Sequence, residues 1–137
     1  MSSILMDANF LIALGYPHDK YHALAKNFVL RNELPFLIPD VILPEVMYNL
    51  KRVGGMRGMI LFAQQLKLSN ILIPLLEIDF DRSISIMQMY ESANLDFVDC
   101  CLIAQAERLE ITKIATFDRR DFSIIRPRHA PYLELYP

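Results

Sequence analysis

The chain has 137 residues, of which 53% are hydrophobic and 22% charged, with a formal net charge of −2. This length fits one domain with a sizeable core, and the composition excludes a disordered chain. The charge balance excludes binding of long nucleic acids by bulk electrostatics, although it allows a small basic site. No apolar stretch reaches the ~20 residues that a membrane span needs, and we find no signal peptide.

Short apolar runs alternate with segments in which apolar residues recur at helical spacing. In chain order, the predicted elements are a strand at 3–6, helices at 9–14 and 19–32, a strand at 35–39, helices at 41–53 and 56–68, a strand at 71–76, helices at 79–93 and 96–110, a strand at 113–117 and a candidate fifth strand at 123–127. Strands alternating with helices predict an α/β fold with a parallel sheet.

The segment 41–68 has the pattern of a helical hairpin, with GGMRG at 54–58 as its turn. Asp40 is a candidate N-cap for its first helix. Pro44 lacks a backbone N–H, so this helix either kinks or begins near Leu43. The two cysteines, Cys100 and Cys101, are neighbours inside an apolar run, and we expect reduced core residues in a cytoplasmic protein.

Five acidic residues lie beside apolar segments, and each has an ordinary structural explanation. Asp7 and Asp96 could be N-caps, Asp99 could complete a capping box, Glu45 could interact with a helix dipole, and Asp118 could start a turn. Ligand sites of open parallel sheets lie at the carboxyl ends of the strands, where Asp7 and Asp118 are expected. Converging carboxylates repel one another unless a cation is bound, and oxygen ligands alone favour Mg²⁺ or Mn²⁺.

Four stretches, ILMDANFLI, LPEVMYNL, LDFVDCCLIAQAERL and IATFDRRDF, together resemble the PIN domain in order and spacing. The resemblance is greatest to the small VapC-type toxin ribonucleases of toxin–antitoxin pairs. It covers essentially the whole chain and implies a three-layer α/β/α fold around a parallel sheet of four to five strands. Residues 1–137 would then form a single PIN-like domain.

The resemblance implies a metal-dependent endoribonuclease that leaves a 5′-phosphate and a 3′-hydroxyl. The residues that match the family's acids, and so would hold Mg²⁺ or Mn²⁺, are Asp7, Glu45, Asp99 and Asp118. The resemblance also implies supporting roles for Asn9, Thr116 and Asp96. We interpret Asp96 chiefly as a helix cap and only secondarily as a residue that surrounds the metal ligands. Asp121 lies close to Asp118 in the sequence, and we prefer Asp118 because it directly follows the strand.

Two clusters of basic residues are candidates for contacts with RNA phosphates. The alternative is that they are ordinary charged surface residues in contact with solvent. Their members are Lys51, Arg52, Arg57, Arg119 and Arg120, with Arg126 and Arg128 beyond. Apolar side chains of the hairpin, among them Met47, Tyr48, Met56, Met59, Ile60 and Phe62, offer an adaptable surface unless the core uses them. In similar toxins this region dimerises and receives an antitoxin segment. We therefore expect a homodimer, an RNA substrate and an antitoxin, but no membrane partner.

Two other functions stay open. A non-catalytic PIN-like scaffold that binds RNA or protein is the main alternative, although the presence of all four acids disfavours it. A phosphatase or phosphotransfer domain with Asp7 as nucleophile is the other. It fits less well, because Asp7-Ala8-Asn9 is a poor match to a D-x-D motif.

Overall fold

The computed structural model describes residues 2–69 and 71–137, in which five short strands form one parallel sheet. The strands are β1 (Ile4–Met6), β2 (Phe36–Pro39), β3 (Leu72–Ile73), β4 (Lys113–Ala115) and β5 (Glu134–Tyr136). The α-helices are α1 (Ala8–Gly15), α2 (His22–Arg31), α3 (Leu43–Ser69), α4 (Glu77–Met89), α5 (Phe97–Leu109) and α6 (Arg120–Ile124). Two 3₁₀ turns, Asp40–Ile42 and Glu91–Ala93, precede α3 and α5.

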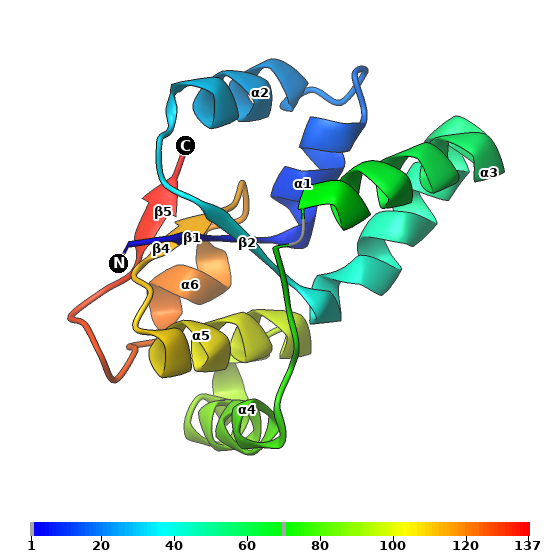
Figure 1. The fold of residues 1–137 in the computed structure, drawn as a ribbon. Helices are drawn as coiled ribbons and strands as arrows, with labels where there is room; N and C mark the ends of the chain where they lie inside the picture. Colours follow the sequence, from blue (N-terminus) through cyan, green and yellow to red (C-terminus); the bar gives the residue numbers. More distant parts are fainter. Residues whose placement is uncertain (1, 70) are drawn as a thin grey trace.

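The sheet has the strand order β3-β2-β1-β4-β5 and lies between two layers of helices. Figure 1 shows α1, α2 and α3 on one side and α4, α5 and α6 on the other. This confirms the predicted three-layer α/β/α architecture. Because β1 and β4 are parallel neighbours, with Met6 opposite Ala115, the residues that follow each strand meet at the same edge.

Helix α5 is the most completely buried helix of the layer that it forms with α4 and α6. Its residues from Cys100 to Ala106 are all buried, and both cysteines are free. A helix that is apolar around its circumference packs on several sides, and α5 contacts both α4 and α6. Within the described residues, no helix is both long enough and apolar enough to span a membrane.

The predicted hairpin is confirmed, because α3 reverses direction at Gly55 and its two arms fold back beside each other (Figure 1). Gly55 has φ 68° and ψ −175°, a conformation that glycine adopts without steric cost. The arms also pack against α1. A Cβ built on Gly15 would lie 2.8 Å from the ring of Phe62 and 3.3 Å from Leu50, so this close approach requires glycine.

The helix α3 begins at Leu43, which places Pro44 in the first turn, where a missing N–H costs little. The prediction that Asp40 caps this helix was wrong. Asp40 lies inside the preceding 3₁₀ turn, and its Oδ1 accepts the Leu75 amide at 3.0 Å. The strand predicted at 71–76 is reduced to two residues, Leu72 and Ile73, because Pro74 has no N–H to continue the ladder.

The C-terminal prediction was wrong in one element. Residues 123–127 do not form a strand, since the short helix α6 occupies 120–124 and buries Phe122 and Asp121. The fifth strand is β5, which pairs with β4 through Tyr136 opposite Ala115. The alternating sequence YLELY at 132–136 carried this signal.

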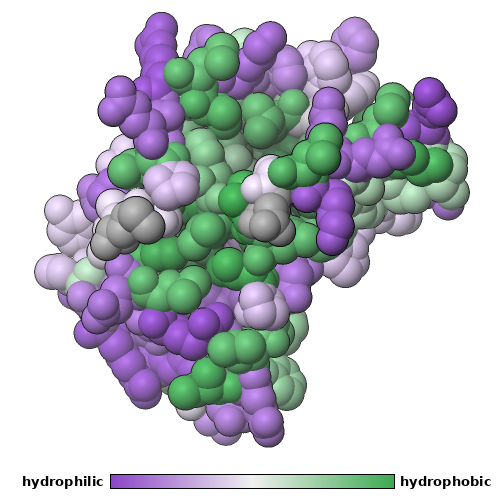
Figure 2. Space-filling model, in the orientation of Figure 1, coloured by the Kyte–Doolittle hydropathy of each residue, from purple (hydrophilic) through white to green (hydrophobic). Residues whose placement is uncertain are grey.

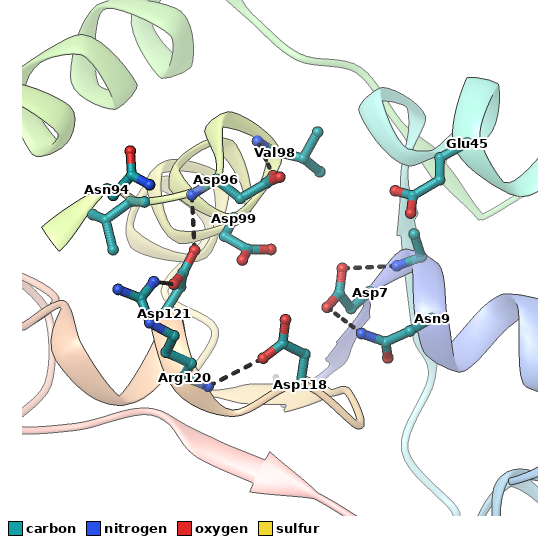
Figure 3. Close-up of a pocket in the computed structure, with 12 residues that line it drawn as sticks. Asp7, Asn9, Glu45, Asn94, Asp96, Val98, Asp99, Asp118, Arg120 and Asp121 are labelled. Carbon is teal, nitrogen blue, oxygen red and sulfur yellow. Dashed lines mark hydrogen bonds and ion pairs between the residues drawn. The ribbon is translucent and has the colours of Figure 1, made fainter.

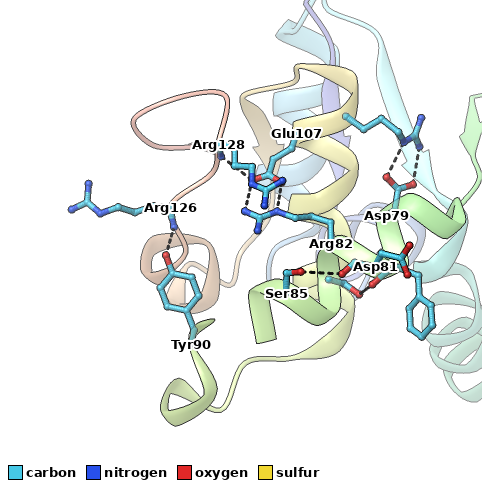
Figure 4. A network of polar contacts seen from close by, with 11 residues as sticks. Asp79, Asp81, Arg82, Ser85, Tyr90, Glu107, Arg126 and Arg128 are labelled. Atoms are coloured by element: carbon cyan, nitrogen blue, oxygen red, sulfur yellow. Dashed lines mark hydrogen bonds and ion pairs between the residues drawn. The ribbon is translucent and has the colours of Figure 1, made fainter. Parts of the chain in front are cut away.

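A polar network fastens α4 to α5 and to the segment before β5 (Figure 4). The Arg82 guanidinium donates from Nε and Nη2 to the Glu107 carboxylate at 2.7 and 3.0 Å, and the backbone N–H of Arg128 donates to it at 2.8 Å. The side chains of Arg82 and Glu107 are only 11% and 9% exposed. Although burial favours the neutral acid, these donors hold the pKa of Glu107 below its ordinary value.

The buried ion pair predicts a large loss of stability on its disruption. Arg82→Met leaves Glu107 buried without its main partner, and we expect the free energy of unfolding to fall by about 3–5 kcal/mol in urea titrations. Arg126→Met is the matched control, because the exposed Arg126 side chain extends away from the network (Figure 4). A loss below about 1 kcal/mol for Arg82→Met would contradict this account.

Candidate metal centre

A pocket of about 440 Å³ opens at the carboxyl edge of the sheet. Six carboxylates line it, and we call it the acidic pocket (Figure 3). They belong to Asp7, Glu45, Asp96, Asp99, Asp118 and Asp121. Among the described residues that line this pocket, Arg120 alone is cationic. The fold thus brings together the four acids predicted to hold a metal, although they come from four different elements or loops.

Asp7 is the most tightly fixed of these acids. It directly follows β1, is 4% exposed, and its Oδ1 accepts the Ala8 amide at 2.8 Å as the N-cap of α1. Its Oδ2 accepts the Thr116 hydroxyl at 2.8 Å and the Asn9 amide at 3.1 Å. Asp7 is therefore both a helix cap and a pocket residue, and the two explanations offered by the sequence do not exclude each other.

Thr116 and Asn9 join the ends of the two neighbouring strands. The Thr116 hydroxyl accepts the Asp118 amide at 3.0 Å, while the Asn9 carbonyl oxygen accepts the Phe117 amide at 2.9 Å. Thr116 is fully buried, so these bonds are partly shielded from water. Both residues hold the segment after β4 against the start of α1 and thereby orient Asp7.

The N-terminus of α5 supplies two further acids. Asp96 is its N-cap, since its Oδ1 accepts the Val98 amide at 2.8 Å, and Asp99 lies in the first turn with 8% of its surface exposed. Figure 3 shows the Asp99 carboxylate pointing into the space between Asp7 and Asp118. Asp96 also lines the pocket, but it is exposed, and one of its oxygens accepts the capping bond, whereas Asp99 is buried.

Asp118 and Asp121 follow β4 but differ in their surroundings. Asp118 is exposed and accepts the Arg120 amide at 3.2 Å. Asp121 is 5% exposed, and it accepts the Arg120 guanidinium at 2.6 Å and the Asp96 amide at 2.8 Å. Asp121 thus ties α6 to the loop that leads into α5, whereas Asp118 retains free oxygen lone pairs toward the pocket (Figure 3).

Glu45 enters the acidic pocket from the first turn of α3, on the side opposite α5 (Figure 3). The residue is exposed as a whole although its carboxyl group is partly buried, and Pro44 before it does not displace it from the pocket lining. Asn94 and Leu95 also line the pocket, and the sequence interpretation missed them. Asn94 has a left-handed backbone with φ 55°, which asparagine tolerates better than most residues. The sequence signal that could have identified Asn94 is its place two residues before Asp96, the N-cap of α5.

Burial and, second to it, neighbouring negative charge raise the pKa values of three of these carboxyl groups. Burial raises the pKa of Asp7 to about 6 against the bonds from Thr116 and Ala8, with smaller contributions from Glu45 and Asp118. Burial, and next the negative charge of Asp7, raise the pKa of Asp99 to about 9. The pKa of Glu45 is also raised, by burial and then by Asp96. The charged forms are therefore unfavourable without a compensating cation.

The donor set fits a hard divalent cation, because it consists of carboxylate oxygens with no nearby thiolate or imidazole in the pocket lining. In the part of the chain that the structure describes, no three acidic, histidine or cysteine side chains already lie within coordinating range of a common point. Repulsion between like charges favours such separation. The side chains would have to move closer together to share an ion.

The predicted RNA-contact residues occupy two different places. Lys51, Arg52 and Arg57 are exposed on α3 around its reversal at Gly55. Arg120 lies in the acidic pocket, and Arg119 donates to the backbone oxygen of Pro137 at 2.6 Å. The backbone N–H groups of Arg126 and Arg128 donate to Tyr90 and Glu107 (Figure 4), and neither arginine lines the acidic pocket.

The fold and the site together describe an α/β protein with an acidic pocket at the carboxyl edge of a parallel sheet. The family model of the PIN domain matches residues 4–126. The chain therefore belongs to the PIN domain family. No curated protein matches it in sequence.

Several solved structures share the fold. VapC20 of Mycobacterium tuberculosis, described as a toxin that cleaves the sarcin–ricin loop, is 23% identical, with a TM-score of 0.81 over 98% of this chain and 100% of that one. A toxin–antitoxin complex from Klebsiella pneumoniae is 22% identical, with a TM-score of 0.70 and 96% and 99% covered. DNA-bound VapBC from Salmonella typhimurium is 13% identical, with a TM-score of 0.72 and 98% and 97% covered.

The raised pKa values predict that the metal-free protein loses stability as the pH rises. Between about pH 4 and pH 9 the folded chain keeps a proton on Asp99 that the unfolded chain releases, at a cost of up to about 1.4 kcal/mol per pH unit. Asp99→Asn removes this cost. In EDTA, its melting temperature should exceed that of the parent protein, and by more at pH 8 than at pH 5.

Asp81→Asn is the control for this measurement, because Asp81 is an exposed acid of α4 outside the acidic pocket. Its effect should be small and independent of pH. An Asp99→Asn protein with the same melting temperature as the parent at both pH values would show that burial and repulsion impose no cost on Asp99, contrary to this account.

Proposed function

We propose that the protein is a metal-dependent endoribonuclease and the toxin of a toxin–antitoxin pair, acting in the cytoplasm as a single domain of residues 1–137. The observation that carries this proposal is the convergence of six carboxylates in one pocket of a PIN domain. The structural neighbours described as toxins support it. Retention of every predicted acid at this pocket disfavours a non-catalytic scaffold.

In this proposal Asp7, Glu45, Asp99 and Asp118 hold one or more Mg²⁺ or Mn²⁺ ions. A divalent ion in such a site supplies a Lewis acid for a phosphate oxygen and lowers the pKa of bound water. Thr116 and Asn9 fix the Asp7 carboxylate, so that its oxygens need little reorganisation. Asp121 is left out of this set because its carboxylate already pairs with a cation, the Arg120 guanidinium, at 2.6 Å.

The remaining groups around the acidic pocket suit an RNA substrate. The capping bond of Asp96 keeps the N-terminus of α5, and with it Asp99, directed into the pocket. Lys51, Arg52 and Arg57 on the hairpin, together with Arg119 and Arg120 beside Asp118, are proposed to contact backbone phosphates. Hydrolysis breaks a phosphodiester P–O bond with water as the attacking group and leaves a 5′-phosphate and a 3′-hydroxyl.

A nuclease assay with matched carboxamide variants tests this function. Asp7→Asn and Asp99→Asn should reduce hydrolysis of RNA in Mg²⁺ or Mn²⁺ by at least about 100-fold, because each removes a charged oxygen ligand. Asp96→Asn is the matched control, and it should keep most of the activity because asparagine caps a helix nearly as well as aspartate. Wild-type rates in both pocket variants would refute the assignment, and equal losses in all three would place Asp96 among the ligands.

We also propose that the protein forms a homodimer through the α3 hairpin and binds a small antitoxin. Exposed apolar side chains on the hairpin support this, with Tyr48 68%, Met56 50%, Ile60 43% and Leu61 47% exposed. The neighbours described as toxin–antitoxin complexes support a protein partner. An arginine from that partner would suit the acidic pocket, since a guanidinium fork pairs with carboxylates.

The dimer is tested by a charge on the exposed hairpin surface. Ile60→Glu should shift the sedimentation coefficient from dimer to monomer at micromolar concentration, because a carboxylate in a desolvated contact is unfavourable. Asn27→Glu, on the exposed face of α2, is the control and should remain dimeric. A wild-type protein that sediments as a monomer would contradict this part of the proposal.

A further inference from the structure

A second hollow, of about 450 Å³, adjoins the acidic pocket and has a different chemistry. Asn9, Glu45 and Asp118 line both, so the two are continuous at the carboxylates. The rest of the second hollow is formed by Ile12 of α1, by residues 19–21 before α2, and by Phe117. We call it the Tyr21 hollow. A phosphodiester held at the acidic pocket would therefore place a neighbouring nucleotide at its entrance.

The wall of the Tyr21 hollow is a fixed aromatic surface. The half-buried ring of Tyr21 stacks on Phe117 with centroids 4.3 Å apart and planes 9° apart. Phe117 in turn stacks on the fully buried Phe10 at 5.6 Å and 18°. The Phe117 amide is held by the Asn9 side chain at 2.9 Å. The Tyr21 ring is thus the outer member of a column of parallel rings that is anchored in the core.

The Tyr21 ring has one face that Phe117 does not cover. Phe117 covers the other face, and the ammonium of the exposed Lys20 lies 4.9 Å from the ring centroid. A cation over an exposed ring is weakly held and can be displaced. After displacement, the flexible Lys20 side chain would still reach the entrance of the hollow, where it could pair with a phosphate.

We propose that the Tyr21 hollow is a nucleobase subsite for single-stranded RNA. The base next to the hydrolysed phosphate stacks on Tyr21 and extends the aromatic column, while Lys20 contacts the adjoining backbone phosphate. Stacking on aromatic side chains is the common way in which proteins hold unpaired bases, and it accepts any base because each has a π-face. This inference rests on the proposed function and assigns a substrate contact to a part of the chain outside the metal-binding acids.

The test is the steady-state hydrolysis of a single-stranded oligoribonucleotide in Mn²⁺. Tyr21→Leu keeps apolar bulk against Phe117 but removes the aromatic face, and it should raise KM by about tenfold to a hundredfold with kcat changed less than about threefold. Tyr21→Phe keeps the face and should behave as the wild type. Tyr132→Ala, which removes a 70% exposed tyrosine elsewhere, should leave both constants unchanged. Lys20→Gln should raise KM and weaken its dependence on salt.

A binding measurement separates this inference from the function on which it rests. The Asp99→Asn protein is titrated into labelled oligoribonucleotides, each of which lacks the base at one position, and binding is followed by fluorescence anisotropy. Loss of the base at one particular position should weaken binding. In the double variant Asp99→Asn/Tyr21→Leu, loss of that same base should have no further effect. An active wild type with unchanged KM in Tyr21→Leu would overturn the subsite and leave the nuclease standing. A wild type that neither hydrolyses nor binds the oligoribonucleotide would overturn both.

Discussion

The buried carboxylate of Asp7, fixed between the ends of β1 and β4, is the constraint on which the site depends. Three donors hold it, from Ala8, Asn9 and Thr116, and two of them also bind the segment that follows β4. The parallel pairing of β1 with β4 is therefore joined to the geometry of the acidic pocket. A change that loosens this carboxylate would also loosen Asp118, because Thr116 and Phe117 link the two.

The rest of the pocket is organised by opposing electrostatic effects. The N-termini of α1 and α5 point toward it, and their amides favour the nearby carboxylates of Asp7 and Asp96. Burial and mutual repulsion act against the charged forms, above all at Asp99. Arg120 relieves the repulsion only in part, since it pairs with Asp121. The fold thus maintains a site whose negative charge is incompletely neutralised by its own side chains.

The layers of the fold could be predicted from the sequence because their signals are local. Four of the strands could be predicted from short apolar runs that are separated by segments with helical spacing of apolar residues. The reversal of α3 could be predicted from Gly54 and Gly55. Asp7 and Asp118 could be placed at one edge because each follows a strand of a parallel sheet. The capping role of Asp96 was also accessible, since a polar residue before an apolar helical run is a common N-terminal signal.

Other features depend on contacts between distant residues, which periodicity does not encode. The side chain of Asp40 binds the amide of Leu75 rather than its own helix, 35 residues away in the chain. The short apolar run at 123–127 has the pattern of a strand. In the structure, Phe122 is buried as part of the helix α6, and Ile125 is buried as the residue that ends this helix. The stacking of Tyr21 on Phe117 was likewise hidden, because Tyr21 also fits the apolar face of a helix.

The central claim is that the acidic pocket binds a divalent cation by releasing protons that burial and repulsion keep on its carboxylates. Calorimetric titration of Mn²⁺ at pH 7, in two buffers of different ionisation enthalpy, measures this directly. The account predicts Mn²⁺ binding accompanied by the release of about one proton, as expected for ligands that must be deprotonated, with both signals lost in Asp99→Asn. Binding without proton release, or equal binding by Asp99→Asn, would contradict it.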